Sequence, residues 1–348
     1  MNIQQALEKI IDKNNLTTNE MQSVIRSIMQ GETTPAQIGG FLIALRMKGE
    51  TIEEIAAAAK VMREFALKVE IEGDNLIDIV GTGGDGMHTF NISTTAAFVI
   101  AAAGGKVAKH NNRSVSSKSG SADVLELAGV KLGLVPEHVA ECVKSVGVGF
   151  MFAPAHHNAT KFALGPRKEL AVRTIFNMLG PLTNPANVPN LLIGVYSKEL
   201  TVPIASVMKA LKNEHVLVVH SDDGMDEISI AAPTSIAELK DGKILEYDIT
   251  PEEFGLKRSD NKDIIVHSIE DSLTVMESVL NNTPGAARDI VLLNAGAAIY
   301  TSNLAATLND GIKMAEKALT TGAAKKKLEQ LILLSNALGE KSGQSKSP

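Results

Sequence analysis

The stretch LIDIVGTGGDGMHTFNISTTAAFVIAAAGG, residues 76–105, decides the fold of this chain. Its first five residues are apolar except for Asp78, and a cluster of glycines follows them. Residues 93–103 are rich in alanine and predict a helix, which Gly104 and Gly105 end before a second short strand over residues 106–109. A strand, a glycine turn and a helix in this order make one unit of a parallel α/β sheet.

The chain beyond this stretch repeats the same alternation of strand and helix. Further strands are predicted over residues 148–152, 191–196 and 216–220, with helical segments between them. Residues 240–247, with Asp241-Gly242 inside, predict a β-hairpin, and the pattern is helical again after residue 271. We therefore expect a mainly parallel central sheet flanked by helices.

The residues before this stretch have a helical period throughout. Thr17 with Glu20 and Thr51 with Glu54 have the spacing of capping boxes, and the second of these helices is predicted to run towards Val69. About four helices and no strand are expected. We predict an all-helical domain over residues 1–72, an α/β domain over residues 73–339 that binds the substrates, and a disordered tail over residues 340–348. The helical part is too short to bury its apolar faces alone, so we expect it to pack on the C-terminal helices.

Composition excludes several classes of protein. The 34 basic and 40 acidic residues give a net charge of −6, and there is no tryptophan, which disfavours a nucleic-acid partner. The single cysteine, Cys142, excludes a disulfide framework and a multi-cysteine zinc site. The N-terminus has no signal-peptide core, and the apolar residues 96–105 are far fewer than the roughly 20 that span a membrane. We expect a cytoplasmic protein without a membrane partner.

The glycine segment DIVGTGGDG, residues 78–86, matches the dinucleotide-binding pattern at Gly81, Gly83 and Gly86. That interpretation is rejected, because the pattern needs an acidic residue about 20 positions further on, and the next carboxylate after Asp85 is Asp123. The loop and the following NIST, residues 91–94, instead offer backbone amides and hydroxyls to a phosphorylated ligand. A tight turn without a ligand is the alternative.

Two other segments have the composition of a phosphate site. KHNNRSVSSKSGS, residues 109–121, contains three cations, five serines and no acid, as a charged phosphate ester requires; a mobile polar linker is the alternative. In HSDDGMDEIS, residues 220–229, Asp226 and Glu227 follow a predicted strand and suit Mg²⁺, which one or two carboxylates hold together with water and substrate phosphates. An acidic surface turn is the alternative there.

The three segments together resemble the anthranilate phosphoribosyltransferase family. The matching motifs are DIVGTGGDG, FNIST, KHNNRSVSSKSGSADVLE, PAHH, GPRKEL, RTIFNMLGPLTNP and DGMDEIS, in order between Asp78 and Ser229. The resemblance implies a class III phosphoribosyltransferase fold, similar to the nucleoside phosphorylases, with a helical N-terminal domain. It also implies a homodimer through that domain, with a monomer as the alternative. The implied reaction transfers phosphoribose from 5-phosphoribosyl 1-pyrophosphate to the amine of anthranilate, in tryptophan biosynthesis, with Mg²⁺ as cofactor.

The resemblance also assigns residues to each ligand. Those expected to contact the phosphoribosyl donor are Gly81, Gly84, Asp85, Thr89, Asn91, Ile92, Ser93, Thr94, Lys109, His110, Asn111, Asn112, Arg113, Ser114, Val115, Ser116, Ser117 and Ser121. Those expected to hold magnesium are Ser93, Asp226 and Glu227. Those expected to bind anthranilate or line its route are Gly81, His110, Asn112, Pro154, His157 and Arg167, the last placed just before a helix predicted over residues 168–179.

The expected mechanism is dissociative. Magnesium and the cationic loop, through Lys109 and Arg113, would stabilise the charge on pyrophosphate as it leaves, and the neutral amine needs no general base. His156 and His157 are neighbours that cannot face each other on a helix, so lining the substrate route is favoured over metal binding. Histidines that only pack in the fold or lie at the surface are the alternative. Asn111 and Asn158 stand where the family usually has glycine and proline. A pyrimidine nucleoside phosphorylase and a non-enzymatic nucleic-acid-binding relative are the competing functions.

Overall fold

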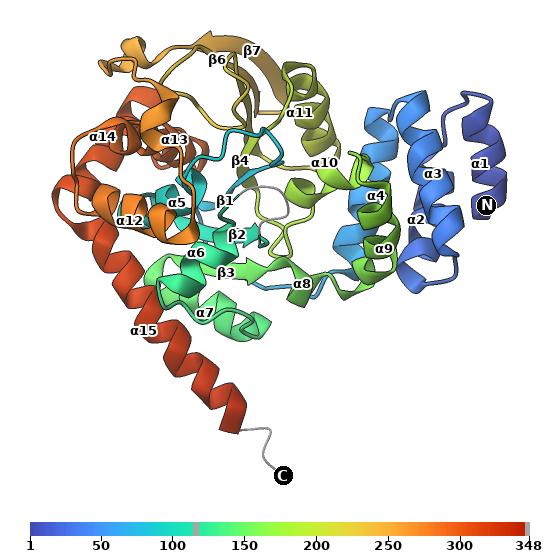
Figure 1. The fold of residues 1–348 in the computed structure, drawn as a ribbon, viewed down its shortest axis with the longest axis horizontal. Coiled ribbons are helices and arrows are strands. Elements are labelled where there is room, and N and C mark those ends of the chain that lie inside the picture. Colours follow the sequence, from blue (N-terminus) through green and yellow to red (C-terminus); the bar gives the residue numbers. More distant parts are fainter. Residues whose placement is uncertain (114–117, 345–348) are drawn as a thin grey trace.

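The computed structural model describes residues 1–113 and 118–344. The chain opens with four helices, which form a bundle at one end of the molecule (Figure 1). They are α1 (Ile3–Ile11), α2 (Thr18–Gln30), α3 (Pro35–Lys48) and α4 (Ile52–Phe65).

The predicted capping boxes begin two of these helices. The Thr17 hydroxyl accepts from the Glu20 amide at 3.4 Å, and the Glu20 carboxylate accepts from the Thr17 amide at 2.8 Å. The Thr51 and Glu54 pair repeats the arrangement at the start of α4. Helix α4 ends at Phe65, short of the predicted Val69, because the backbone of Ala66 is already extended.

A seven-stranded sheet forms the centre of the rest of the chain, in the order β3-β2-β1-β4-β5-β6-β7. The first five strands are parallel and the last two antiparallel, as expected for a mainly parallel sheet. The predicted hairpin is confirmed, because Asp241 and Gly242 form the turn between β6 and β7 with φ of 50° and 71°. The strands are β1 (Leu76–Gly81), β2 (Lys106–Asn111), β3 (Val148–Phe152), β4 (Asn190–Gly194), β5 (His215–Ser221), β6 (Thr234–Lys240) and β7 (Lys243–Ile249).

Each face of the sheet is covered by its own set of helices (Figure 1). Because successive side chains of a strand point to opposite faces, Ile79 of β1 belongs to one hydrophobic cluster and Val80 to the other. The first cluster joins the sheet to α5 (Ile92–Ala102), α6 (Ser121–Leu127), α12 (Ile269–Leu280), α13 (Ala286–Thr301), α14 (Leu308–Thr320) and α15 (Ala323–Gln344). The second joins it to α10 (Ile175–Leu182), α11 (Thr201–Ala210) and the N-terminal bundle, while α7 (Pro136–Val146) contributes to both.

The N-terminal bundle does not pack on the C-terminal helices, which corrects the expectation from sequence. It packs on α9 (Lys161–Leu170), α10 and α11, whereas α12 to α15 cover the other face of the sheet (Figure 1). Apolar residues of α10 and α11 such as Leu179 and Met208 supply the surface that the bundle buries. The Arg63 guanidinium of α4 also donates to the Leu182 carbonyl at 2.7 Å.

Two further expectations about helices are wrong. The helix predicted over residues 168–179 is two helices, because Ala171 has a φ of 49° and the Thr174 amide starts α10 by donating to the Asn177 side chain at 3.0 Å. Of the disordered tail predicted over residues 340–348, residues 340–344 are instead the end of helix α15, and residues 345–348 lie outside the described residues. The short elements are α8 (Ala153–His156), η1 (Asn158–Thr160), η2 (Lys198–Leu200), η3 (Pro251–Phe254) and η4 (Asn261–Ile264). Within the described residues, no helix combines the length and the apolar character needed to cross a membrane.

Candidate active site

The candidate site lies where the parallel strands end. Three segments start at the carboxyl ends of parallel strands in one sheet: residues 82–91 after β1, the described residues 112–113 and 118–120 after β2, and residues 222–229 after β5, with β4 between β1 and β5. Ligands of open parallel sheets bind at this edge. Three segments that are far apart in the sequence are thus brought together by strand order alone.

Two paired glycines let the β5 loop approach the sheet. Gly81 of β1 lies opposite Gly194 of β4. A Cβ atom on Gly81 would stand 2.4 Å from an Asp226 carboxylate oxygen, and one on Gly194 would stand 1.6 Å from the Asp226 carbonyl oxygen. Only glycine fits at both positions. The Asp226 carboxylate also accepts from the backbone amide of Gly83 at 2.7 Å, which ties it to the glycine loop.

Three carboxylates meet at this point. Burial, with the nearby charge of Asp85, raises the pKa of Asp226 to about 7. Burial and then the charges of Asp226 and Asp85 raise the pKa of Glu227 to about 8, against the lowering effect of Lys109. The carboxylates therefore repel one another in the absence of a cation. Asp85, expected only as a contact of the phosphoribosyl donor, belongs to this cluster.

Lys109 supplies a positive charge beneath the carboxylates. Its side chain is 1% exposed, and its ammonium donates to the Ile79 carbonyl at 2.5 Å and to the Ser93 hydroxyl at 3.2 Å. Burial lowers the pKa of Lys109, and the charges of Asp78 and Glu227 oppose that effect. Lys109 thus acts on the carboxylates from inside the fold and not from the surface of the Ser-rich loop.

The residues present fit a magnesium ion. Asp226 and Glu227 supply hard oxygen ligands with uncompensated charge, and the backbone amide of Ser93 donates to Glu227, which fixes that carboxylate next to the Ser93 hydroxyl. Within the described ranges, no three or more His, Cys, Asp and Glu side chains are grouped so that they could hold a metal ion by themselves. Magnesium does not need such a group, because it normally keeps water and substrate phosphate ligands.

The Ser-rich loop is anchored by polar contacts at its two ends. Ser121 receives hydrogen bonds from Thr94 at 2.8 Å and from Asn111 at 3.0 Å. The Asn91 side chain accepts from the hydroxyls of Ser119 and Ser272, both at 2.7 Å, and so connects the loop to α12. Ser114, Val115, Ser116 and Ser117 lie outside the described residues.

Arg113 is not free in this arrangement. Its guanidinium pairs with Asp123 at 2.9 Å and with Glu126 at 2.8 Å, both on α6, and lies 5.6 Å from the centre of the Phe152 ring. The segment has no acid of its own, as noted from sequence, but the helix that follows it supplies two. In the described conformation Arg113 is thus neutralised.

Two of the residues expected to line the anthranilate route are buried histidines, His110 and His157. The rings of His110 and His157 lie 4.9 Å apart, and the Nε2 atom of each is buried without a hydrogen-bond partner among the described residues. Their other ring nitrogens pair with the backbone carbonyls of Gly180 and Thr183. Burial lowers the pKa of His157 to about 4 and that of His110 well below its usual value. Both rings are therefore neutral at pH 7 and present an acceptor lone pair.

Arg167 belongs to the same wall. Its half-buried guanidinium lies 5.1 Å from the centre of the Phe176 ring and makes no hydrogen bond or ion pair with any described side chain. Phe176 and Gly180 are spaced i and i+4 in α10, so they lie on one face of that helix, and Thr183 is its C-cap residue. This helix and its C-cap thus contact Arg167, His110 and His157. Three of the six residues expected to bind anthranilate or line its route are thus brought together, whereas Gly81, Asn112 and Pro154 are not part of this contact.

Other predicted residues lie around this centre. Thr89 pairs with Ile265 in an isolated bridge, Ile92 starts α5, and Asn112 is exposed and follows β2. Gly84 lies in the glycine loop, and Pro154 is exposed in the short helix α8.

Sequence reasoning missed Asp78 and Asn184. Asp78 is fully buried in β1, and its carboxylate accepts from the Asn184 side chain at 2.7 Å and faces the backbone amide of His110 at 3.4 Å. Burial, opposed by Lys109, raises the pKa of Asp78 to about 6. A lone acid inside an apolar strand was the available signal, since such a residue must have a buried partner.

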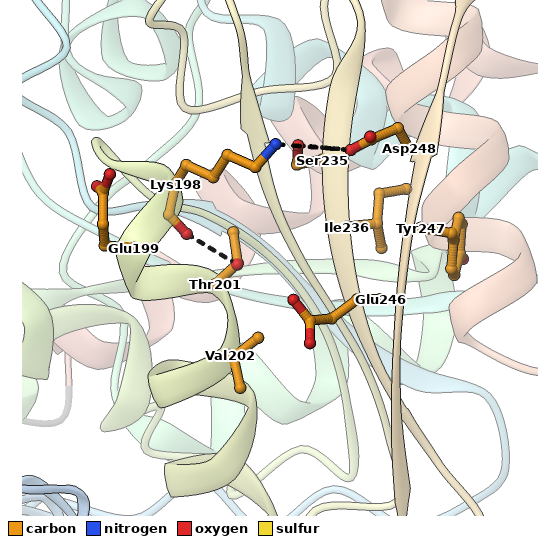
Figure 2. A pocket seen from close by; sticks show the side chains of 9 residues that line it. All are labelled: Lys198, Glu199, Thr201, Val202, Ser235, Ile236, Glu246, Tyr247 and Asp248. Atoms are coloured by element: carbon orange, nitrogen blue, oxygen red, sulfur yellow. Dashed lines mark hydrogen bonds and ion pairs between the residues drawn. The ribbon is translucent and has the colours of Figure 1, made fainter.

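A separate hollow lies away from these strand ends. It has a volume of about 330 Å³ and lies between the start of α11 and the outer hairpin (Figure 2). Among its lining residues, Asp248 accepts from Ser235 at 2.6 Å and lies 3.9 Å from Lys198, so these three polar groups are already paired. We assign no role to it.

Comparison with known proteins agrees with this fold and site. Residues 73–325 match the glycosyl transferase family, a/b domain, and residues 4–66 match the glycosyl transferase family, helical bundle domain. The chain is therefore a glycosyl transferase of the type that joins a helical bundle to an α/β domain.

Comparison with curated relatives shows which glycosyl transferase family the chain belongs to. The chain is 57% identical to the anthranilate phosphoribosyltransferase of Ectopseudomonas mendocina over 338 residues, which are 96% of this chain and 97% of that protein. It is also 57% identical to the enzyme of Cellvibrio japonicus over 95% of this chain and 98% of that protein. The chain belongs to the anthranilate phosphoribosyltransferase family, which acts in tryptophan biosynthesis, so the resemblance seen in the motifs is confirmed.

Solved structures have the same architecture. The anthranilate phosphoribosyltransferase of Thermus thermophilus superposes with a TM-score of 0.90 at 40% identity, covering 95% of this chain and 99% of that one. The Saccharomyces cerevisiae enzyme, solved in complex with PRPP and Mg, has a TM-score of 0.88 at 25% identity and covers 96% and 98%. The expected class III phosphoribosyltransferase fold is confirmed.

Proposed function

We propose that this chain transfers the phosphoribosyl group of 5-phosphoribosyl 1-pyrophosphate to the amine of anthranilate and releases pyrophosphate, in a reaction that requires Mg²⁺. The observation that carries the proposal is the juxtaposition at one sheet edge of a glycine loop with a carboxylate cluster and of a wall of neutral histidines with an unpaired arginine. The yeast relative solved with PRPP and Mg, and the same relative solved with 4-fluoroanthranilate, support it.

The donor half of the site acts by electrostatics. Asp226 and Glu227 would hold the metal, with Ser93 beside them, and the glycine loop and residues 109–121 would hold the phosphates. Magnesium, when bound, neutralises charge on the pyrophosphate leaving group. Lys109 lowers the pKa of Glu227 and so favours the ionised carboxylate that a metal ion requires, and its own positive charge offsets part of that negative charge when an anionic donor approaches.

The acceptor half acts by orientation. Arg167 would bind the anthranilate carboxylate with its planar fork, and the Nε2 atoms of His110 and His157 would accept hydrogen bonds from the amine. A neutral aromatic amine already has the lone pair that attacks C1′, so no residue has to remove a proton before attack. Catalysis then consists of positioning and charge stabilisation.

The proposal includes a homodimer formed through the N-terminal helices and a cytoplasmic location. A reducing compartment is consistent with the single buried cysteine, Cys142. No nucleic-acid partner is proposed, in keeping with the net charge of −6.

The reaction is tested by following anthranilate fluorescence. Mixing the protein with Mg²⁺, anthranilate and phosphoribosyl pyrophosphate should make the fluorescence disappear, and omission of either Mg²⁺ or the donor should abolish the change. Thymidine and uridine with inorganic phosphate serve as the competing substrates. Phosphorolysis of a nucleoside, or persistent fluorescence in the complete mixture, would overturn the proposal.

A further inference from the structure

Arg173 lies between the two halves of the site. It belongs to the connection between α9 and α10, where Ala171 has a left-handed backbone and Thr174 precedes the helix. Its guanidinium donates to the carbonyl oxygen of Gly84 in the glycine loop. Neither the donor set nor the acceptor set assigned from sequence includes Arg173.

The glycine loop is thereby held from two sides. On one side the Gly83 amide donates to Asp226 at 2.7 Å, and on the other the Gly84 carbonyl accepts from Arg173. A Cβ atom on Gly84 would stand 3.2 Å from the Arg173 guanidinium, which shows how closely the two approach. Because its carbonyl oxygen is bound to a cation, Gly84 does not present a free negative dipole to an anionic ligand.

The loop needs such restraint. Gly83, Gly84 and Gly86 have φ values of 68°, 79° and 76°, and glycine has more conformational freedom to lose than any other residue. An unrestrained loop of this kind would have to be ordered by each donor molecule as it binds, at a cost in affinity.

Arg173 is itself held in place by two other elements. Its guanidinium stacks 4.0 Å from the centre of the Tyr196 ring, which follows β4. Its carbonyl oxygen accepts a hydrogen bond from Arg46 near the end of α3, in the N-terminal bundle. The glycine loop, the acceptor helix α10 and the N-terminal helices thus all meet at this one residue.

We propose that Arg173 is a positioning residue that sets the glycine loop for the phosphoribosyl donor and couples this loop to α10 and the N-terminal bundle. The inference rests on the proposed function, because it names the residue that aligns the donor half with the acceptor half. The contacts of Arg173 in this structure are with Gly84, Tyr196 and Arg46. It acts through the Gly84 carbonyl.

The first test compares Arg173→Ala and Arg173→Lys with the wild type. Arg173→Ala should raise the KM for the phosphoribosyl donor by roughly 10-fold, as expected when a charged hydrogen bond is lost, and should change the KM for anthranilate much less. Arg173→Lys keeps the positive charge, so its KM for the phosphoribosyl donor should lie between those of the wild type and Arg173→Ala. Arg258→Ala removes another exposed arginine, one paired with Glu252 at 2.7 Å, and is the matched control that should leave both KM values unchanged.

The second test is a double-mutant cycle with Tyr196→Ala. If the Tyr196 ring acts by holding Arg173, the KM of the double variant for the phosphoribosyl donor should be no higher than that of Arg173→Ala alone. Additive losses would overturn the proposed link, and a lower melting temperature with unchanged KM values would reduce Arg173 to a structural contact.

Calorimetry separates this inference from the proposed reaction. Binding of phosphoribosyl pyrophosphate with Mg²⁺ to wild type and Arg173→Ala can be measured without anthranilate. A wild type that binds the donor but does not consume anthranilate contradicts the proposed function and leaves the Arg173 comparison intact. Equal donor affinity of the two proteins contradicts the role of Arg173.

Discussion

Arg167 gives the most direct test of acceptor recognition at the scale of a single residue. Its guanidinium is half-buried beside Phe176 and is unpaired within the described structure, so it is free for a carboxylate. Arg167→Ala should remove about 1.5–3 kcal/mol of charged hydrogen bonding, which raises the KM for anthranilate roughly 10- to 100-fold. Steady-state kinetics with each substrate varied in turn measures this. The exposed neighbour Lys168→Ala is the control, and equal effects of Arg167→Ala on both KM values would contradict the assignment.

Asp226 and Glu227 make a second residue-scale prediction. Changing both to Asn and Gln removes the negative charge that recruits the cation but leaves the acceptor wall untouched. The Mg²⁺ concentration needed for half-maximal activity should rise and kcat should fall, with little change in anthranilate binding. Activity titrated against Mg²⁺ measures this. Superimposable magnesium curves for the two proteins would refute the metal role, and loss of a low-pH limb alone would indicate a general base.

Glu238 predicts a pH dependence of stability. It is 6% exposed, and although burial by itself raises its pKa, hydrogen bonds from His215, Tyr300 and Tyr247 outweigh that effect and lower the pKa to about 2. A carboxyl whose pKa is lowered by folding stabilises the fold at pH values above its pKa in the unfolded chain, which is 4.5. This stabilisation is lost as the pH falls towards about 2, the pKa in the folded protein.

Glu238→Gln should therefore lower the free energy of unfolding by about 1–3 kcal/mol at pH 7. The difference from wild type should shrink as the pH falls from about 4.5 towards about 2. Urea denaturation at several pH values measures this. Glu246→Gln, on the exposed outer strand, is the control and should stay within about 0.5 kcal/mol of wild type. A difference that is constant over the acidic range would contradict the assignment.

For single residues, the sequence predicted which segments belong to the candidate site better than it predicted which side chains form ion pairs there. The carboxylate pair and the glycine loop could be recognised because residue type and order are sufficient for them. The pairing of Arg113 could not, since its partners Asp123 and Glu126 become neighbours only when α6 turns back towards β2. Arg173 begins the matching motif RTIFNMLGPLTNP, but that motif does not indicate a contact with the glycine loop, and only the fold places Arg173 next to Gly84.

At the scale of elements, the approach of the β5 loop to β1 and β4 depends on Gly194. Gly194→Ala would place a Cβ atom 1.6 Å from the Asp226 carbonyl, so the loop has to move. We expect a loss of about 1–3 kcal/mol of stability together with a higher magnesium requirement. Thermal unfolding and magnesium titration measure the two effects. Gly165→Ala in α9, where a Cβ atom meets nothing within 4 Å, is the control. A Gly194→Ala enzyme with wild-type magnesium dependence would contradict this account of the loop.

Strands and helix starts were the most predictable elements. Apolar runs bounded by glycines located the five parallel strands to within a few residues, and Asp241-Gly242 located the hairpin. The break between α9 and α10 was missed because alanine gives no signal for a left-handed backbone, which Ala171 nevertheless adopts. The packing partner of the N-terminal bundle was also missed, since amphipathic helices show that a face is buried but not against what.

At the scale of the whole molecule, the predicted homodimer is tested by its mass. The four N-terminal helices leave large apolar side chains at the surface, among them Ile11 at 68% and Met47 at 81% exposure. A second copy that packs against the bundle would cover these side chains. Light scattering at micromolar concentration should give about twice the chain mass of 36.9 kDa. Ile11→Lys with Met47→Lys should shift the mass towards one chain, and a monomeric wild type would contradict the dimer.

The order of strands in the sheet also affects how the protein folds while it is being synthesised on the ribosome. β4 lies between β1 and β5, yet Asn190 is translated long after Gly81, so one edge of β1 has no partner while residues 82–189 are being made. At about 5–20 residues per second this interval lasts roughly 5–20 s. Ile77, Ile79 and Val80 then form part of an apolar edge that is open to other chains. Nascent chains of this protein should therefore be most sensitive to chaperone depletion before β4 emerges.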